Sequence, residues 1–212
     1  MYKIKSILIV FVFFLLSCVS GSQMKLSSDY IWTPETADGR KLRNLFYYTL
    51  EDVYKGINSI SFPLQKDGIG LTTSYKCQHE KCSEDDINEV WLYTISHLDI
   101  VINQNDYDKL NMRVRYILNR RLPDIIFALR NVDFSSILDY QDFEGFLFTF
   151  TWGVKDYKNG VFEKTEYETA RIYVPKKTYI AYVNKSINLI TLIRSSHIYG
   201  QQSDGKKSKL TF

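Results

Sequence analysis

The strongest constraint on the fold of this 212-residue chain is a strict alternation of side chains in residues 146–153. Large aromatic residues occupy every second position there, and other residues stand between them. A period of two places alternate side chains on opposite faces of a β-strand. Residues 156–160 have turn composition, and residues 165–174 predict a returning strand. We expect an antiparallel hairpin whose first strand has Phe146, Phe148, Phe150 and Trp152 on one face and Leu147, Thr149, Thr151 and Gly153 on the other.

Before residue 143, apolar residues recur at three- and four-residue intervals, which indicates amphipathic helices. The spacing predicts three of them, over residues 39–57, 87–102 and 107–118. The third should end before Pro123. Because residues 103–106 form a short turn, the second and third helices should pack as an antiparallel helical hairpin. Residues 62–70 predict a loop, and residues 71–75 a short strand.

The segment after Pro175 is compatible with two structures. Pro175 can open a helix at its first position, or residues 179–183 can form a third strand. Residues 209–212 can add an edge strand to the sheet. Helices followed by antiparallel strands are typical of the α+β class. We therefore predict a single domain over residues 36–212, with N-terminal helices packed on a C-terminal antiparallel β-sheet.

The chain begins with the layout of an export signal. Lys3 and Lys5 precede an unbroken apolar run over residues 7–16, which ends at the small residues Ser17 and Cys18. Ten apolar residues in a helix cover about 15 Å, roughly half of a ~30 Å hydrocarbon core. The run is therefore too short to span a membrane, and residues 1–17 are predicted to be a cleaved signal peptide.

The end of this signal, Leu15-Leu16-Ser17-Cys18, resembles the lipobox of bacterial lipoproteins. The resemblance implies that Cys18 is lipidated and becomes the first residue of an exported mature protein, whose acyl chains then hold it at a membrane. Several acyl chains give a durable anchor, whereas one gives only marginal attachment. Val19 stands where the family's inner-membrane retention signal has Asp, which favours the outer membrane if the cell has one. The alternative is an ordinary secretory signal with a cysteine at the cut.

Residues 18–35 are mostly small, polar or irregular, and predict a flexible tether between lipid and domain. The formal net charge of +3 falls to about +1 once Lys3 and Lys5 are removed, with acids and bases interspersed. This balance argues against a nucleic-acid partner. We expect most of the 16 Tyr and 13 Phe to form the hydrophobic core. The alternative is that some of them form a contact surface for a protein partner.

Two cysteines remain once Cys18 is assigned to lipid. Cys77 and Cys82 lie five residues apart in an exported chain, which favours a disulfide that closes a small loop. A metal site with Cys77, His79 and Cys82 as ligands is a second interpretation, but it needs a fourth ligand and its spacing matches no established zinc pattern. Free thiols are the third.

The sequence contains no recognisable catalytic motif. His97 lies between Ser96 and Asp99, but neighbours on a helix point in different directions, so these three cannot form a triad locally. The sequence does not identify a catalytic partner for His197. Nucleophile-elbow, phosphate-loop and dinucleotide motifs are missing, so we expect no cofactor.

Six carboxylates flank or follow the main strand, and we interpret them as a solvated edge that discourages aggregation. They are Asp139, Asp142, Glu144, Glu163, Glu166 and Glu168. Paired carboxylates also perform glycosidase chemistry. The expected function is a lipid-anchored, non-enzymatic binding or assembly module with an unknown envelope or surface partner. A hydrolase of envelope glycan or peptide is the alternative, and a small-ligand carrier the third.

Overall fold

The computed structural model describes residues 27–73, 89–103, 107–158 and 161–212. Its fold combines helices with one six-stranded sheet, so the predicted α+β class is confirmed. In chain order the elements are η1 (Ser27–Asp29), α2 (Ala37–Leu45), α3 (Tyr47–Ser59), β1 (Leu64–Thr73), β2 (Val90–Asn103), α5 (Leu110–Ala128), η3 (Leu129–Asn131), α6 (Ser135–Leu138), β3 (Phe143–Lys158), β4 (Val161–Pro175), α7 (Lys176–Val183), α8 (Leu189–Arg194), β5 (His197–Gln201) and β6 (Lys207–Leu210). No helix among these is both long and apolar enough to cross a membrane.

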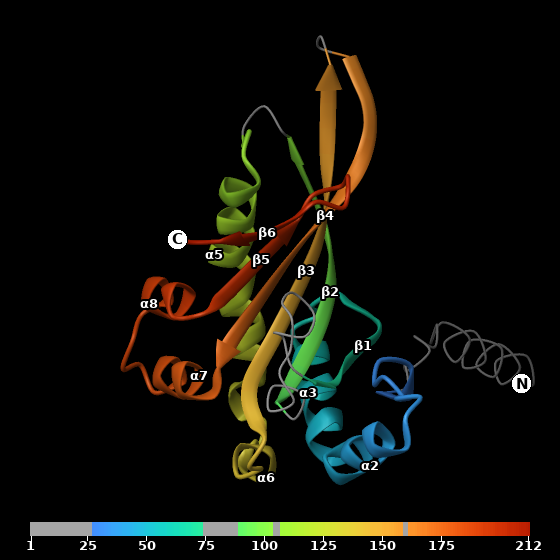
Figure 1. The fold of residues 1–212 in the computed structure, drawn as a ribbon, viewed down its shortest axis with the longest axis vertical. Helices are drawn as coiled ribbons and strands as arrows, with labels where there is room; N and C mark the ends of the chain where they lie inside the picture. The colour runs from blue at the N-terminus through green and yellow to red at the C-terminus, as the bar shows by residue number, and fades with distance from the viewer. Residues whose placement is uncertain (1–26, 74–88, 104–106, 159–160) are drawn as a thin grey trace, which may run out of the picture.

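The six strands lie in the order β1 to β6. The sheet is mixed and not wholly antiparallel as predicted, because one neighbouring pair is parallel. Strands β2 and β3 run parallel, and the other four pairs are antiparallel. A parallel pair needs a crossover, and α5 provides it. In Figure 1, β5 and β6 pass in front of α5, which lies along one face of the sheet.

The predicted hairpin of residues 143–174 is present as β3 and β4, at the centre of this sheet. Its aromatic face packs on the helices as part of the main core, where Phe146, Phe148, Phe150 and Trp152 are fully buried. Of the two structures expected after the hairpin, a helix or a third strand over residues 179–183, the helix is present. Pro175 is the N-cap of α7, and Tyr179 of that helix stacks on Phe146 with 3.9 Å between ring centroids.

The helix predicted over residues 87–102 is wrong, and with it the helical hairpin. Residues Val90–Asn103 form strand β2, and the first five of them are all buried. Leu92 faces the main core, whereas Trp91 and Tyr93 belong to a second cluster on the other face. A strand buried on both faces is apolar almost throughout, so it satisfies helical spacing by accident.

Other boundaries also differ from the sequence predictions, since the helix predicted over residues 39–57 is divided at Phe46 into α2 and α3. The predicted loop over residues 62–70 mostly belongs to β1, which begins at Leu64. Helix α5 continues through Pro123 to Ala128. Proline removes one helical hydrogen bond, but Leu122 and Ile125 on either side of it are fully buried in the core. Burial of that apolar face offsets the lost bond.

The N-terminal part of the described chain docks onto the sheet edge at β1. Ile31 is fully buried and bridges Ile69, with Trp32 N donating to Ile69 O at 2.8 Å and Ile69 N donating to Tyr30 O at 2.9 Å. At the opposite edge, a tight turn joins β5 to β6. Gly205 adopts φ +86°, a left-handed conformation that a glycine accepts without steric cost.

Candidate functional site

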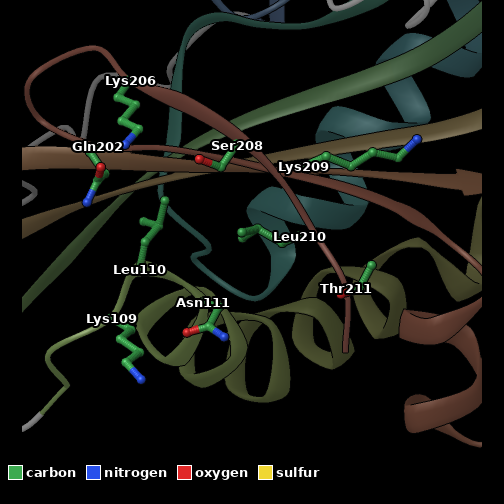
Figure 2. A pocket seen from close by; sticks show the side chains of 9 residues that line it. All are labelled: Lys109, Leu110, Asn111, Gln202, Lys206, Ser208, Lys209, Leu210 and Thr211. Carbon is green, nitrogen blue, oxygen red and sulfur yellow. The ribbon is translucent and has the colours of Figure 1, made fainter.

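A surface pocket lies between the first turn of α5 and the edge strand β6, and we call it the α5–β6 pocket (Figure 2). Its volume is about 380 Å³. Residues 109–111 of the α5 terminus line one side, residues 208–211 line the other, and Gln202 and Lys206 of the β5–β6 turn close one end. The pocket therefore joins segments that lie about a hundred residues apart in the sequence.

A glycine on β5 shapes the apolar floor of this pocket. Gly200 pairs with Ser208 across the hairpin, and a Cβ atom there would lie 2.8 Å from Leu110 Cδ2 and 3.0 Å from Leu210 Cδ1. Both distances are shorter than ordinary carbon–carbon contacts. Leu110 and Leu210 can pack over β5 only because position 200 has no side chain.

A buried ion pair fixes the first turn of α5 to the sheet. Arg113 Nε and Nη2 donate to the two carboxylate oxygens of Glu168 on β4, each at 2.7 Å. Arg113 Nη1 also donates to Tyr107 O at 2.5 Å. The two side chains are only 3% and 2% exposed. The bidentate contact constrains the orientation of α5 relative to β4 as well as the distance between them. A planar guanidinium donates two parallel hydrogen bonds to a carboxylate in only one relative orientation.

The position of Glu168 corrects the expectation of a solvated carboxylate edge. Glu168 is on the helix-facing side of β4, in line with Ala170, and both are buried. An aligned row of glutamates in a strand does not reveal that one of them meets an arginine from a distant helix. Glu166 is partly buried and accepts a hydrogen bond from Ser203.

The α5–β6 pocket has a basic character. Lys109, Lys206 and Lys209 contribute to its lining, and no Asp or Glu does so. Helix α5 has no acidic residue in its first turn and no side-chain cap, so the positive end of its dipole is uncompensated from within the helix. Asp204 is close by in the turn, where its carboxylate accepts a hydrogen bond from Lys206 N at 2.9 Å. The lysines around the apolar floor make the rim of the pocket suited to a ligand that carries negative charge.

The cysteine-based predictions lie outside the described residues. Cys18, Cys77, His79 and Cys82 all belong to segments that the structure does not describe, so the lipid anchor, the disulfide and the weaker metal interpretation remain predictions. Among the described residues, no group of three His, Cys, Asp or Glu side chains is placed to hold a metal ion.

The two described histidines lie on strands. His97 is exposed on β2, with its ring centroid 5.2 Å from that of Tyr167. It does not lie on a helix as the sequence predicted. Ser96 is fully buried on the opposite face of the strand from His97, so strand alternation and not helix geometry prevents a local triad. His197 is the first residue of β5.

Glu144 and Glu168 lie too far apart to be the carboxylate pair that glycoside hydrolysis requires. Glu144 lies at the start of β3, next to the Gly145–Pro175 pair, whereas Glu168 is opposite Trp152. Eight residues of strand separate these positions, or about 27 Å at about 3.4 Å per residue. Glycosidase carboxylates lie roughly 5–9.5 Å apart. Asp139 and Asp142 lie just before β3, and the side chain of Glu163 falls outside the described part of the chain.

The second face of the sheet carries a smaller aromatic cluster and a cavity of about 170 Å³. Tyr93, Leu147 and Arg171 are among the residues that line it. Burial, with a smaller contribution from the charge of Asp67, raises the pKa of the Tyr93 phenol well above its usual value. The phenol donates to the backbone carbonyl of Asp67 at 3.4 Å. Tyr93 is therefore held neutral, as a hydrogen-bond donor.

Sequence reasoning did not single out the lysines of the α5–β6 pocket. Residues 206–209 contain three lysines next to a predicted edge strand, which was the one available signal. The partner surface on α5 could not be identified, because no sequence pattern links Lys109 to that strand.

Comparisons with models of protein families, with curated proteins and with solved structures gave no match. The fold and the site define the chain as an α+β protein in which one mixed sheet carries a basic pocket at its open edge.

Proposed function

We propose that this protein is a lipid-anchored envelope lipoprotein that acts without catalysis, by binding another macromolecule at the α5–β6 pocket. The observation that carries the binding function is the pocket itself, in which apolar Leu110 and Leu210 lie between lysines beside a sheet edge. An apolar floor with a polar rim is the usual composition of a protein contact. Assembly of an envelope structure, surface contact and immunity to an envelope toxin are all tasks of this kind.

The proposed anchor is Cys18, and it rests on the Leu15-Leu16-Ser17-Cys18 motif with its basic and apolar lead-in. The acyl chains would make the membrane the first partner of the protein, at the outer membrane if the cell has one. The binding domain would then act at a membrane surface. Restriction to a surface raises the effective concentration of a partner in the same envelope.

Site-specific photocrosslinking tests the binding function. A photoreactive amino acid replaces Ser208 in the pocket and, in a matched control, Asn58. Asn58 is exposed on α3, a helix that packs against β1 at the opposite edge of the sheet from β6. The full chain is expressed in its own cells, and crosslinking is performed in intact envelopes. We expect a defined adduct from position 208 and none from position 58. The same adducts from both positions, or none from position 208, would refute the pocket as the binding site.

Intact mass tests the anchor and the cysteines. Protein extracted from its own membranes without reduction should have the mass of a chain that starts at Cys18 plus acyl groups. Cys77 and Cys82 should resist alkylation until a reductant is added, because a disulfide has no free thiol. A mass that still includes residues 1–17 would remove the anchor, and two thiols that react at once would remove the disulfide.

A further inference from the structure

Strand β6 is the open edge of the sheet, since no described strand pairs with its outer side. The hairpin geometry shows which backbone groups face outward. Gln202 N donates to Lys206 O at 3.0 Å, so these residues form a hydrogen-bonded pair. Hydrogen-bonded and non-hydrogen-bonded pairs alternate in antiparallel strands. Ser208 therefore directs its backbone groups at β5, whereas Lys207 and Lys209 direct their N–H and C=O groups away from it.

The side chains of β6 divide between the two faces of the sheet. Ser208 and Leu210 line the α5–β6 pocket. Leu210 and Leu110 both pack over Gly200. Alternation places the Lys207 side chain on the opposite face, with the Cβ of Lys209. A segment lying along β6 would meet the apolar floor of the pocket, Leu110 and Leu210, with one set of its side chains. Its other set would lie on the face that carries the exposed Lys207.

We infer that the partner contributes an extended, acidic segment that adds to β6 as a seventh strand. Its apolar side chains enter the α5–β6 pocket over Leu110 and Leu210, and its acidic side chains lie against Lys207 and Lys209. Backbone pairing with a sheet edge supplies affinity in this mode, and the pocket for alternate side chains supplies specificity. This inference rests on the proposed binding function of the pocket and names its partner by chemistry.

Charge complementarity selects this occupant over a second copy of the chain. Two β6 strands paired edge to edge would bring the lysines of residues 206–209 against one another. Like charges placed directly opposite destabilise a strand pair, and edge lysines are a common protection against self-pairing. An acidic segment reverses the sign of that interaction.

Peptide binding to the full chain, purified in detergent, tests this inference. The probe is a fluorescent seven-residue peptide that alternates valine and glutamate, and binding is followed by anisotropy. A matched peptide replaces every glutamate with lysine. We expect the acidic peptide to bind saturably and at least about tenfold more tightly, because each opposite-charge cross-strand pair is favourable and each like-charge pair is not.

Two more peptides test the strand geometry on the unmodified protein. One carries N-methyl groups on all glutamates, and the other carries them on all valines. Alternate N–H groups of a strand point to opposite edges, so a strand that pairs along one edge tolerates one set of methyl groups and not the other. We expect one methylated peptide to bind like its parent and the other to lose detectable binding.

Variants at position 207 test the protein side. Lys207→Ala removes the charge but keeps the outward N–H, whereas Lys207→Pro removes both without touching the pairs to β5. Proline is tolerated at such an edge position. We expect Lys207→Pro to weaken binding roughly fivefold more than Lys207→Ala does, the usual effect of one hydrogen bond.

Equal affinity for the acidic and basic peptides, or equal binding by the two methylated peptides, would overturn the strand-addition inference. The proposed function would survive that result if Ser208 still crosslinked to a partner, because the pocket would then bind by another geometry. If the Ser208 crosslink also failed, both would fall.

Discussion

The buried pair of Arg113 and Glu168 predicts a large, asymmetric response to mutation. Replacement of Arg113 by methionine keeps most of the side-chain volume but leaves the Glu168 carboxylate 98% buried without its counter-charge. Removal of one partner of a buried pair typically costs about 3–5 kcal/mol of the free energy of unfolding. Single domains have only about 5–15 kcal/mol in total, so this variant should be close to unfolding.

The double variant Arg113→Met/Glu168→Leu should behave differently, because it removes both charges together. Desolvation of an ion pair nearly cancels its attraction, so its replacement by apolar residues is often neutral or stabilising. We expect the double variant to lie within about 1 kcal/mol of the unmodified protein and to be far more stable than either single variant. The coupling energy between the two positions should then exceed about 3 kcal/mol.

Urea unfolding of the full chain, followed by tryptophan fluorescence, measures these differences. Trp91 and Trp152 are both nearly or fully buried and should report the transition. Arg113→Lys is an additional control, since lysine keeps the charge but cannot form the two-pronged contact. If Arg113→Met and Glu168→Leu each changed the free energy of unfolding by less than about 1 kcal/mol, the range of an exposed pair, the buried pair would not exist in solution.

Three further perturbations have defined outcomes. Cys18→Ser should move the protein from the membrane to the soluble fraction on cell fractionation, and retention in the membrane would contradict the anchor. Burial raises the pKa of Tyr93 and Tyr179 above the ordinary value of 10.0, so both stay protonated in the folded state while the unfolded chain ionises. The contribution of these two tyrosines to the free energy of unfolding should be constant well below pH 10 and fall above it by up to about 1.4 kcal/mol per pH unit for each tyrosine. Urea midpoints at pH 9 and 11 measure the fall, which Tyr179→Phe should reduce by about half. Gly205→Ala should cost about 1 kcal/mol at φ +86°, and thermal unfolding will show a smaller loss for Gly205→Asn.

The β3–β4 hairpin was predictable from sequence because its first strand has chemically different faces. Phe148 and the other aromatic residues of the strand are stabilised by burial in the core, whereas Thr149 is not. The two-residue alternation can therefore be recognised without knowing which strands lie on either side. Strand β2 carries no such contrast. Its central place in the sheet buries both Leu92 and Trp91, and that burial on two sides depends on β1 and β3, which a local pattern cannot report.

The candidate pocket was beyond sequence reasoning for a related reason. Its geometry depends on the pair between Arg113 and Glu168, which are 55 residues apart, and on the absence of a side chain at Gly200. Each of these residues has an ordinary interpretation in its own segment, as a solvated helix arginine, a strand glutamate and a strand glycine. The parallel placement of β2 beside β3 determines which of them meet, and no residue pattern encodes that placement locally.

The docking of Ile31 at the β1 edge determines how far the opposite edge can stand from a membrane. Eight residues lie between Cys18 and Ser27, whose hydroxyl donates to Glu51 of the folded domain, so this segment can span at most about 32 Å. Ile31 bridges the outer side of β1, so six strand spacings of about 4.8 Å place β6 roughly 29 Å from Ile31. With lipid on Cys18, the width of the sheet would limit how far the basic edge at β6 can lie from the membrane surface. Partners anchored in the same membrane could then reach that edge.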